Sequence, residues 1–127
     1  MTARRTKIFF DGGCRPNPGP IEVAVVAGGA AMIGRSLGEG GSIDAEWLAL
    51  IAALRFARER GIDDFVLLGD SASVVAQALG RVPARGAAAA HLAAFRDLAG
   101  TGPAPRVRHI GRAQNLAGIA LAKLHPR

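Results

Sequence analysis

Apolar positions along the chain follow two different spacings. In roughly the first third, short apolar or alternating runs are separated by glycine and proline, which predicts strands joined by turns. Further on, apolar residues recur three and four positions apart, which predicts helices packed through one face. Strands are expected over residues 5–11, 22–27, 30–37, 65–69 and 106–110. Helices are expected over residues 45–60, 71–79, 87–98 and 116–124.

The order of these elements, β-β-β-α-β-α-α-β-α, predicts an α/β fold. Gly28 and Gly29 favour a hairpin turn between the second and third strands, so the first three strands are expected to form an antiparallel meander. The strands at 65–69 and 106–110 each follow a helix and are expected to be parallel neighbours of the first strand. We therefore expect a single domain, residues 1–127, with a five-stranded mixed sheet of three antiparallel and two parallel strands flanked by helices.

Composition and charge narrow the functional class. The 127 residues suit one domain, and a single cysteine excludes a disulfide framework and a zinc ribbon. No apolar run approaches the ~18 residues of a membrane span, so we expect a cytoplasmic protein without a membrane partner. We also expect a monomer. Sixteen Lys and Arg against ten Asp and Glu give a net charge of +6, which favours nucleic acid as the partner but could serve solubility alone.

Basic residues flank the first and the last expected strand. If these two strands lie close together, the basic side chains would form a stripe that binds phosphates. They could instead protect the edges of the sheet. The residues concerned are Arg4, Arg5, Lys7, Arg106, Arg108 and Arg112.

Three acidic residues stand where expected strands meet expected helices. Asp11 ends the first strand, Glu46 lies in the first turn of the first helix, and Asp70 follows the fourth strand. Taken singly, they could be a turn residue, an acid favoured by the helix dipole, and a helix N-cap. If they converge at the carboxyl ends of strands, they could stay ionised together only around cations. Carboxylate oxygens suit Mg²⁺ or Mn²⁺, and two such ions are typical of phosphodiester hydrolysis.

Four blocks of the sequence resemble the motifs of type 1 ribonuclease H domains. They are residues 11–20 (DGGCRPNPGP), 45–50 (AEWLAL), 69–75 (GDSASVV) and 109–122 (HIGRAQNLAGIALA). The resemblance covers almost the whole chain and implies a ribonuclease H-like fold. It also implies an endoribonuclease that cuts the RNA strand of an RNA/DNA hybrid. In such an enzyme the residues that match Asp11, Glu46 and Asp70 bind two Mg²⁺ ions. For this chain the resemblance therefore implies Mg²⁺ or Mn²⁺ as the cofactor.

The resemblance breaks at a fourth carboxylate that the family usually has. It stands four residues beyond the asparagine that matches Asn115, and here Ile119 occupies the position. An isoleucine cannot bind a metal ion. Asn115 lies one helical turn earlier on the same face, so its amide oxygen could partly substitute as a metal ligand. We therefore expect a reduced site of three carboxylates with weak activity.

Two residues near the last block are further catalytic candidates. His109 matches a histidine that some family members use for proton transfer or product release, and its titration range suits that task. Arg112 matches a basic position that could contact the scissile phosphate. Each could equally be a residue of the surface. His91 and His125 have no motif around them and are expected at the surface.

Contacts to nucleic acid are expected around the first block and the start of the first helix. Groups in the turn after Asp11 could touch sugar hydroxyls, which distinguish RNA from DNA. Cys14 could instead be a packed thiol, and Trp47 could stack on a base or belong to the core. The expected contact residues are Gly12, Cys14, Asn17, Ser42 and Trp47.

Three functions remain open from the sequence. The first is a metal-dependent endoribonuclease acting on RNA/DNA hybrids. The second is a domain of the same fold that no longer cleaves and holds hybrid, double-stranded RNA or a protein partner. The third is an exonuclease of the wider superfamily, which the order of the motifs disfavours.

Overall fold

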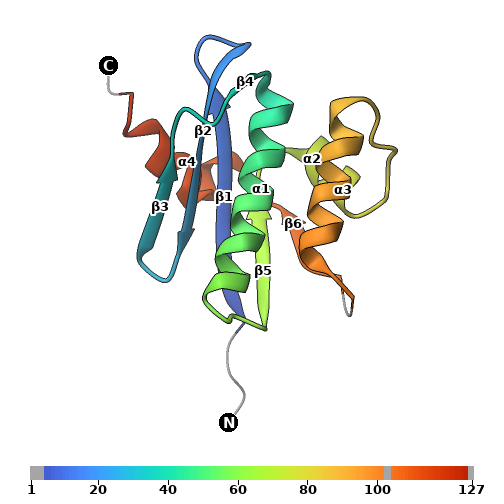
Figure 1. Cartoon of the computed structure of the whole chain (residues 1–127). Coiled ribbons are helices and arrows are strands. Elements are labelled where there is room, and N and C mark those ends of the chain that lie inside the picture. The colour runs from blue at the N-terminus through green and yellow to red at the C-terminus, as the bar shows by residue number, and fades with distance from the viewer. Residues whose placement is uncertain (1–4, 102–103, 126–127) are drawn as a thin grey trace.

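The fold is built on a mixed sheet with helices on both faces, as a computed structural model describes for residues 5–101 and 104–125 (Figure 1). Five strands lie in the order β3-β2-β1-β5-β6, and the two-residue β4 pairs with β2. β1, β2 and β3 are antiparallel, whereas β5 is parallel to β1 and β6 is parallel to β5. The expected mixed sheet is confirmed, with β4 as an addition. The strands are β1 (Thr6–Cys14), β2 (Gly19–Ala27), β3 (Ala30–Gly34), β4 (Glu39–Gly40), β5 (Phe65–Gly69) and β6 (Arg106–His109).

β1 is longer than expected and carries Asp11 inside the strand rather than at its end. Gly12 and Gly13 stay in the ladder, and the pairing with β2 continues to Cys14 opposite Ile21. Residues without a side chain add no bulk to this part of the ladder. Two adjacent glycines after Asp11 indicate a turn, which is why the expected strand stops at residue 11. The tip of the hairpin therefore projects beyond Asp11 and forms one wall of the site described below.

β6 is not a neighbour of β1, because β5 lies between them. The expected parallel pairing of both late strands with β1 is therefore wrong for β6. The predicted basic stripe is divided accordingly. Arg5 and Arg106 both bind Asp64, at 3.0 and 3.4 Å, at the amino ends of β1 and β6. Arg112 lies at the carboxyl end of β6, and Arg4 lies outside the described residues.

The helices divide between the two faces of the sheet (Figure 1). α1 packs on β1, β2 and β5 and carries α3 on its outer side, whereas α4 packs on β1, β2 and β3. α1 begins three residues before the expected start, because the Asp44 carboxylate accepts a hydrogen bond from the Gly41 backbone N–H at 3.2 Å. A short 3₁₀ turn, η1, was not expected. The bounds are α1 (Ser42–Glu59), α2 (Ala72–Ala78), α3 (Ala87–Ala99), η1 (Arg112–Gln114) and α4 (Leu116–Ala122).

The main core lies between α1 and the sheet, and a smaller cluster lies under α4. Trp47 is wholly buried in the main core. Its indole N–H donates to the Gln77 side-chain oxygen at 2.8 Å, and its ring packs edge-on against Phe95 of α3. The prediction that Trp47 contacts nucleic acid is therefore wrong, because α3 covers it. Among the helices in the described part of the chain, none is long and apolar enough to cross a membrane.

Candidate active site

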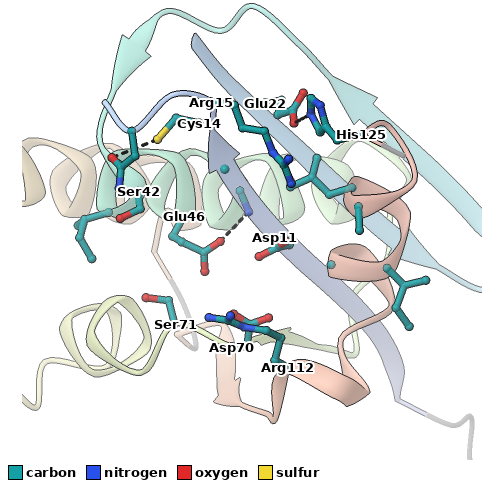
Figure 2. Close-up of a pocket in the computed structure, with 18 residues that line it drawn as sticks. Asp11, Cys14, Arg15, Glu22, Ser42, Glu46, Asp70, Ser71, Arg112 and His125 are labelled. Carbon is teal, nitrogen blue, oxygen red and sulfur yellow. Dashed lines mark hydrogen bonds and ion pairs between the residues drawn. The ribbon is translucent and has the colours of Figure 1, made fainter. Parts of the chain in front are cut away.

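Asp11, Glu46 and Asp70 converge at one edge of the sheet, as the sequence predicted (Figure 2). One carboxylate oxygen from each residue lies within 4.8 Å of the other two. β1 and β5 are parallel neighbours, so Asp11 and Asp70 emerge side by side. Asp70 is free to face the cluster because Ser71, the residue after it, caps α2 by accepting from the Val74 N–H at 3.4 Å.

Gly12 brings β1 directly against the first turn of α1. A Cβ atom at position 12 would overlap the carbonyl oxygen of Ala45, so only glycine allows this approach. The backbone N–H of Gly12 then donates to Oε1 of Glu46 at 2.6 Å. The other carboxylate oxygen, Oε2, is buried and has no hydrogen-bond partner among the described residues.

Burial and the neighbouring acids disfavour the ionised forms of two carboxyl groups in the cluster. Burial, followed by contact with the Asp11 carboxyl, raises the pKa of Glu46 to about 9. Burial also raises the pKa of Asp11, and the neighbouring Asp70 charge adds to the effect. Glu46 would therefore hold a proton at neutral pH unless a cation replaced it. Three carboxylates, one of which has a buried oxygen without a partner in the described part of the chain, are a donor set that fits a hard divalent cation.

Asn115 positions Asp70 and does not present an oxygen to the cluster. It is wholly buried, and its side-chain NH₂ donates to Oδ2 of Asp70 at 2.9 Å and to the Phe10 carbonyl at 3.0 Å. Its amide oxygen accepts from the Ala117 N–H at 3.1 Å and so caps α4. The expected partial substitution for a fourth carboxylate is not what this geometry provides. The asparagine instead fixes the orientation of an acid that belongs to the cluster.

An open hollow of about 620 Å³ lies over the carboxylates. Of the expected substrate-binding residues, five line it: Gly12, Cys14, Asn17, Ser42 and Arg112. Cys14 and Asn17 lie together, with Sγ 3.4 Å from the Asn17 side-chain oxygen. His109 is not in the lining, and its Nε2 lies 3.2 Å from the main-chain oxygen of Asp70. The first turn of α1 and the β1–β2 hairpin therefore form the wall opposite Arg112.

Helix α4 gives the hollow an uncharged wall beside Asp11. Ile119 lines it with 46% of its surface exposed. A Cβ atom at Gly118 would lie 3.4 Å from Oδ2 of Asp11, so this face of α4 is in direct reach of the cluster. Ile119, which stands at the position of the missing fourth carboxylate, thus faces the hollow.

Three charged or titratable residues of the lining, Arg15, Glu22 and His125, were not singled out from the sequence as part of the site. Arg15 extends from the β1–β2 hairpin into the hollow (Figure 2). His125 was expected at the surface, but it pairs with the carboxylate of Glu22 on β2 and both line the hollow. These two residues are 103 positions apart and no local signal connects them. His91, also expected at the surface, is half-buried and binds Asp44 at 2.9 Å, which lowers the pKa of Asp44.

Comparisons with known proteins agree with the fold. The family described as reverse transcriptase-like matches residues 11–125. A curated relative, Ribonuclease HI of Halobacterium salinarum, is 41% identical over 81 residues, which are 60% of this chain and 41% of that relative. The match thus spans less than half of the relative's length.

Two solved structures extend the similarity to nearly the whole chain. RNase H1 from the halophilic archaeon Halobacterium salinarum superposes with a TM-score of 0.80 and 33% identity, covering 93% of this chain and 94% of that one. LC11-RNase H1, which was isolated from compost, was solved in complex with an RNA/DNA hybrid. That complex superposes with a TM-score of 0.71 and 28% identity, covering 92% of this chain and 93% of that one.

Proposed function

Because the chain belongs to the type 1 ribonuclease H family, we propose that it is a metal-dependent endonuclease that hydrolyses the RNA strand of RNA/DNA hybrids. The observation that carries this proposal is the convergence of Asp11, Glu46 and Asp70, where Oε2 of Glu46 is buried and has no hydrogen-bond partner among residues 5–101 and 104–125. The LC11-RNase H1 complex with an RNA/DNA hybrid supports the choice of substrate.

The three carboxylates would hold two divalent ions, Mg²⁺ or Mn²⁺. When bound, such ions make a water molecule nucleophilic and stabilise the leaving oxygen. The chain itself supplies the positioning. The Gly12 N–H holds Glu46, and the Asn115 amide holds Asp70, so two of the three acids are oriented before any substrate arrives. This preorganisation would strengthen the binding of the divalent ions, because Glu46 and Asp70 would lose little side-chain freedom when the ions bind.

The walls of the hollow would bind the substrate strand. Arg112 lines the hollow and would contact the scissile phosphate. Cys14, Asn17 and Ser42, on the opposite wall, offer the polar groups that could recognise 2′-hydroxyls, which only the RNA strand carries. His109 would act beside Asp70 in proton transfer or product release, if it turns towards the hollow.

The uncharged α4 wall should weaken the binding of the second divalent ion. With Ile119 at the wall and the Asn115 oxygen bound to α4, none of the residues that the structure describes presents a fourth carboxylate to Asp11 from this side. We therefore propose weak cleavage that Mn²⁺ supports better than Mg²⁺. The same wall favours a second candidate function, a domain that binds nucleic acid or a protein partner without cutting.

A cleavage time course on a labelled RNA/DNA hybrid tests both candidates, with Mg²⁺, Mn²⁺ or chelator. We expect internal cuts in the RNA strand that need metal and disappear in Asp70→Asn. Ile119→Asp should raise the rate with Mg²⁺, because it adds a carboxylate to the hollow. The matched control is Leu116→Asp, which adds the same charge to α4 at an exposed residue outside the lining (47% exposed).

The outcomes separate the candidates. Cleavage by Ile119→Asp alone, with none by the natural chain, would favour the binding domain. Cleavage that starts only from strand ends would favour an exonuclease. Equal stimulation by Leu116→Asp and Ile119→Asp would contradict the assignment of the α4 wall as the missing ligand position.

A further inference from the structure

A second, smaller hollow adjoins the one over the carboxylates. It measures about 200 Å³ and lies between the β1–β2 hairpin, the loop after β3 and the end of the chain's last described segment. Arg15, Glu22 and His125 line both hollows, so the two share one wall. The smaller hollow adds Arg35 and Ser36 to the lining. A strand lying over the carboxylates could therefore continue into it.

A buried acid organises this shared wall. The side chain of Glu22 is only 10% exposed, and one of its oxygens pairs with Nε2 of His125. The other lies 3.3 Å from Nε of Arg35. In the β1–β2 register Glu22 stands opposite Gly13, two residues along from Asp11, so it projects from the same face of the sheet as Asp11. Glu22 thus holds the side chains of Arg35 and His125 in the shared wall. It is not one of the three clustered carboxylates.

Arg35 directly precedes a segment that is hydrogen-bonded to β2. The backbone N–H of Leu37 donates to the Ile21 carbonyl at 3.0 Å, and the N–H of Ile21 donates to the Gly38 carbonyl at 2.9 Å. Ser36, which lies between Arg35 and Leu37, has φ of +57°, a left-handed conformation that is uncommon for residues other than glycine. The side chain of Arg35 is 56% exposed and lines the hollow from a loop without regular secondary structure.

Arg15 completes the wall from the other side. Its side chain points into the main hollow, between the Glu22–His125 pair and Asp11 (Figure 2). Within the described ranges it forms no ion pair, whereas Arg5, Arg35 and Arg106 each do. Two guanidinium groups against one carboxylate leave the wall with a net positive charge even when His125 is neutral. Guanidinium groups bind phosphate oxygens with paired hydrogen bonds.

We propose that the second hollow is a phosphate subsite, in which Arg15 and Arg35 bind a phosphodiester of the hybrid close to the one that is cut. The subsite rests on the proposed function for its ligand, because it extends the same substrate path. The carboxylates repel phosphates, so a cationic anchor next to them would hold the strand in place over the cluster.

Binding of a fluorescent hybrid, followed by anisotropy with Ca²⁺ as the divalent cation, tests the subsite without depending on cleavage. We expect Arg15→Gln and Arg35→Gln each to weaken binding about tenfold and to lower the salt slope of log Kd by about one. Arg96→Gln is the matched control, because it removes the same charge from an exposed position on α3 and should leave Kd unchanged. Lysine at either position should restore part of the affinity, and thermal melts of each variant verify folding.

A set of hybrids with a single neutral methylphosphonate linkage identifies the phosphate. We expect one linkage near the cut site to weaken binding by the natural chain, and to have little further effect on Arg15→Gln or Arg35→Gln. Its place in the RNA or in the DNA strand reports which strand supplies the phosphate. If folded variants bind as the natural chain does, or no linkage shows this coupling, the subsite is overturned while the proposed function stands. If the natural chain binds no hybrid, both are overturned.

Discussion

Glu46→Gln should stabilise the protein in the absence of metal, although it removes a residue of the site. The pKa of Glu46 is raised from 4.5 to about 9 in the folded state, mainly by burial. Because the folded-state pKa lies above the unfolded one, the stability that the protonated carboxyl provides is fully present below about pH 4.5. It is lost progressively as the pH rises towards 9. Glutamine keeps a neutral group of the same shape at every pH.

The magnitude follows from the distance between pH 7 and the unfolded pKa. Between pH 4.5 and 7 the unfolded chain ionises at this position while the folded chain stays protonated, which lowers the stability of the natural chain by about 3 kcal/mol at pH 7. For a chain of this length, that corresponds to a rise of roughly 10 °C in the Tm of Glu46→Gln. The amide oxygen of glutamine can still accept from the Gly12 N–H, and its NH₂ can donate to Asp11.

Thermal and urea unfolding in chelator, at pH 4.5, 6 and 7.5, measure this difference. We expect the gap between Glu46→Gln and the natural chain to be close to zero at the lowest pH and to widen with pH. The control is Glu59→Gln, an exposed substitution on the same helix. Saturating Mn²⁺ should stabilise the natural chain more than Glu46→Gln, because only the former keeps its full ligand set. A gap that does not change with pH, or a less stable Glu46→Gln in chelator, would refute the reasoning.

Three further substitutions test other parts of the molecule. Gly12→Ala should lower the free energy of unfolding in urea by about 1–3 kcal/mol, because the added methyl group forces β1 away from α1. Asn115→Ala should lower kcat for hybrid cleavage more than it weakens Mn²⁺ binding by calorimetry; a loss of Mn²⁺ affinity as large as that of Asp70→Asn would contradict its positioning role. Trp47→Phe should leave Kd for hybrid unchanged and lower the stability by about 1–2 kcal/mol, since it removes one buried hydrogen bond.

The elements and the acidic cluster could be predicted because short-range patterns determine them. The apolar run at 65–69 was predicted with the bounds that β5 has. Asp70 directly follows this run, and the carboxyl ends of neighbouring parallel strands meet at one edge of a sheet. Glu46 sits at the start of a helix whose apolar spacing is regular. The convergence of Asp11, Glu46 and Asp70 then follows from the order of the strands.

The parts that could not be predicted depend on contacts between distant residues. The Glu22–His125 pair joins β2 to the segment after α4, and neither residue has a local pattern that indicates the other. The orientation of the Asn115 amide depends on which neighbours offer a donor and an acceptor. Trp47 has the spacing of a core residue, but only the position of α3 decides that no face of its ring reaches the hollow.

The anchoring of α4 has a consequence for how the protein is made. Asp11 and Asp70 leave the ribosome well before Asn115, which orients Asp70, and before His125, which ties the segment after α4 to Glu22. Synthesis of the residues from 70 to 125 takes about 3–11 s at ~5–20 residues per second. During that interval a nascent chain carries all three acids but has neither the α4 wall nor the amide that holds Asp70. A nascent chain that stops short of α4 therefore holds the three acids without the contact that orients Asp70.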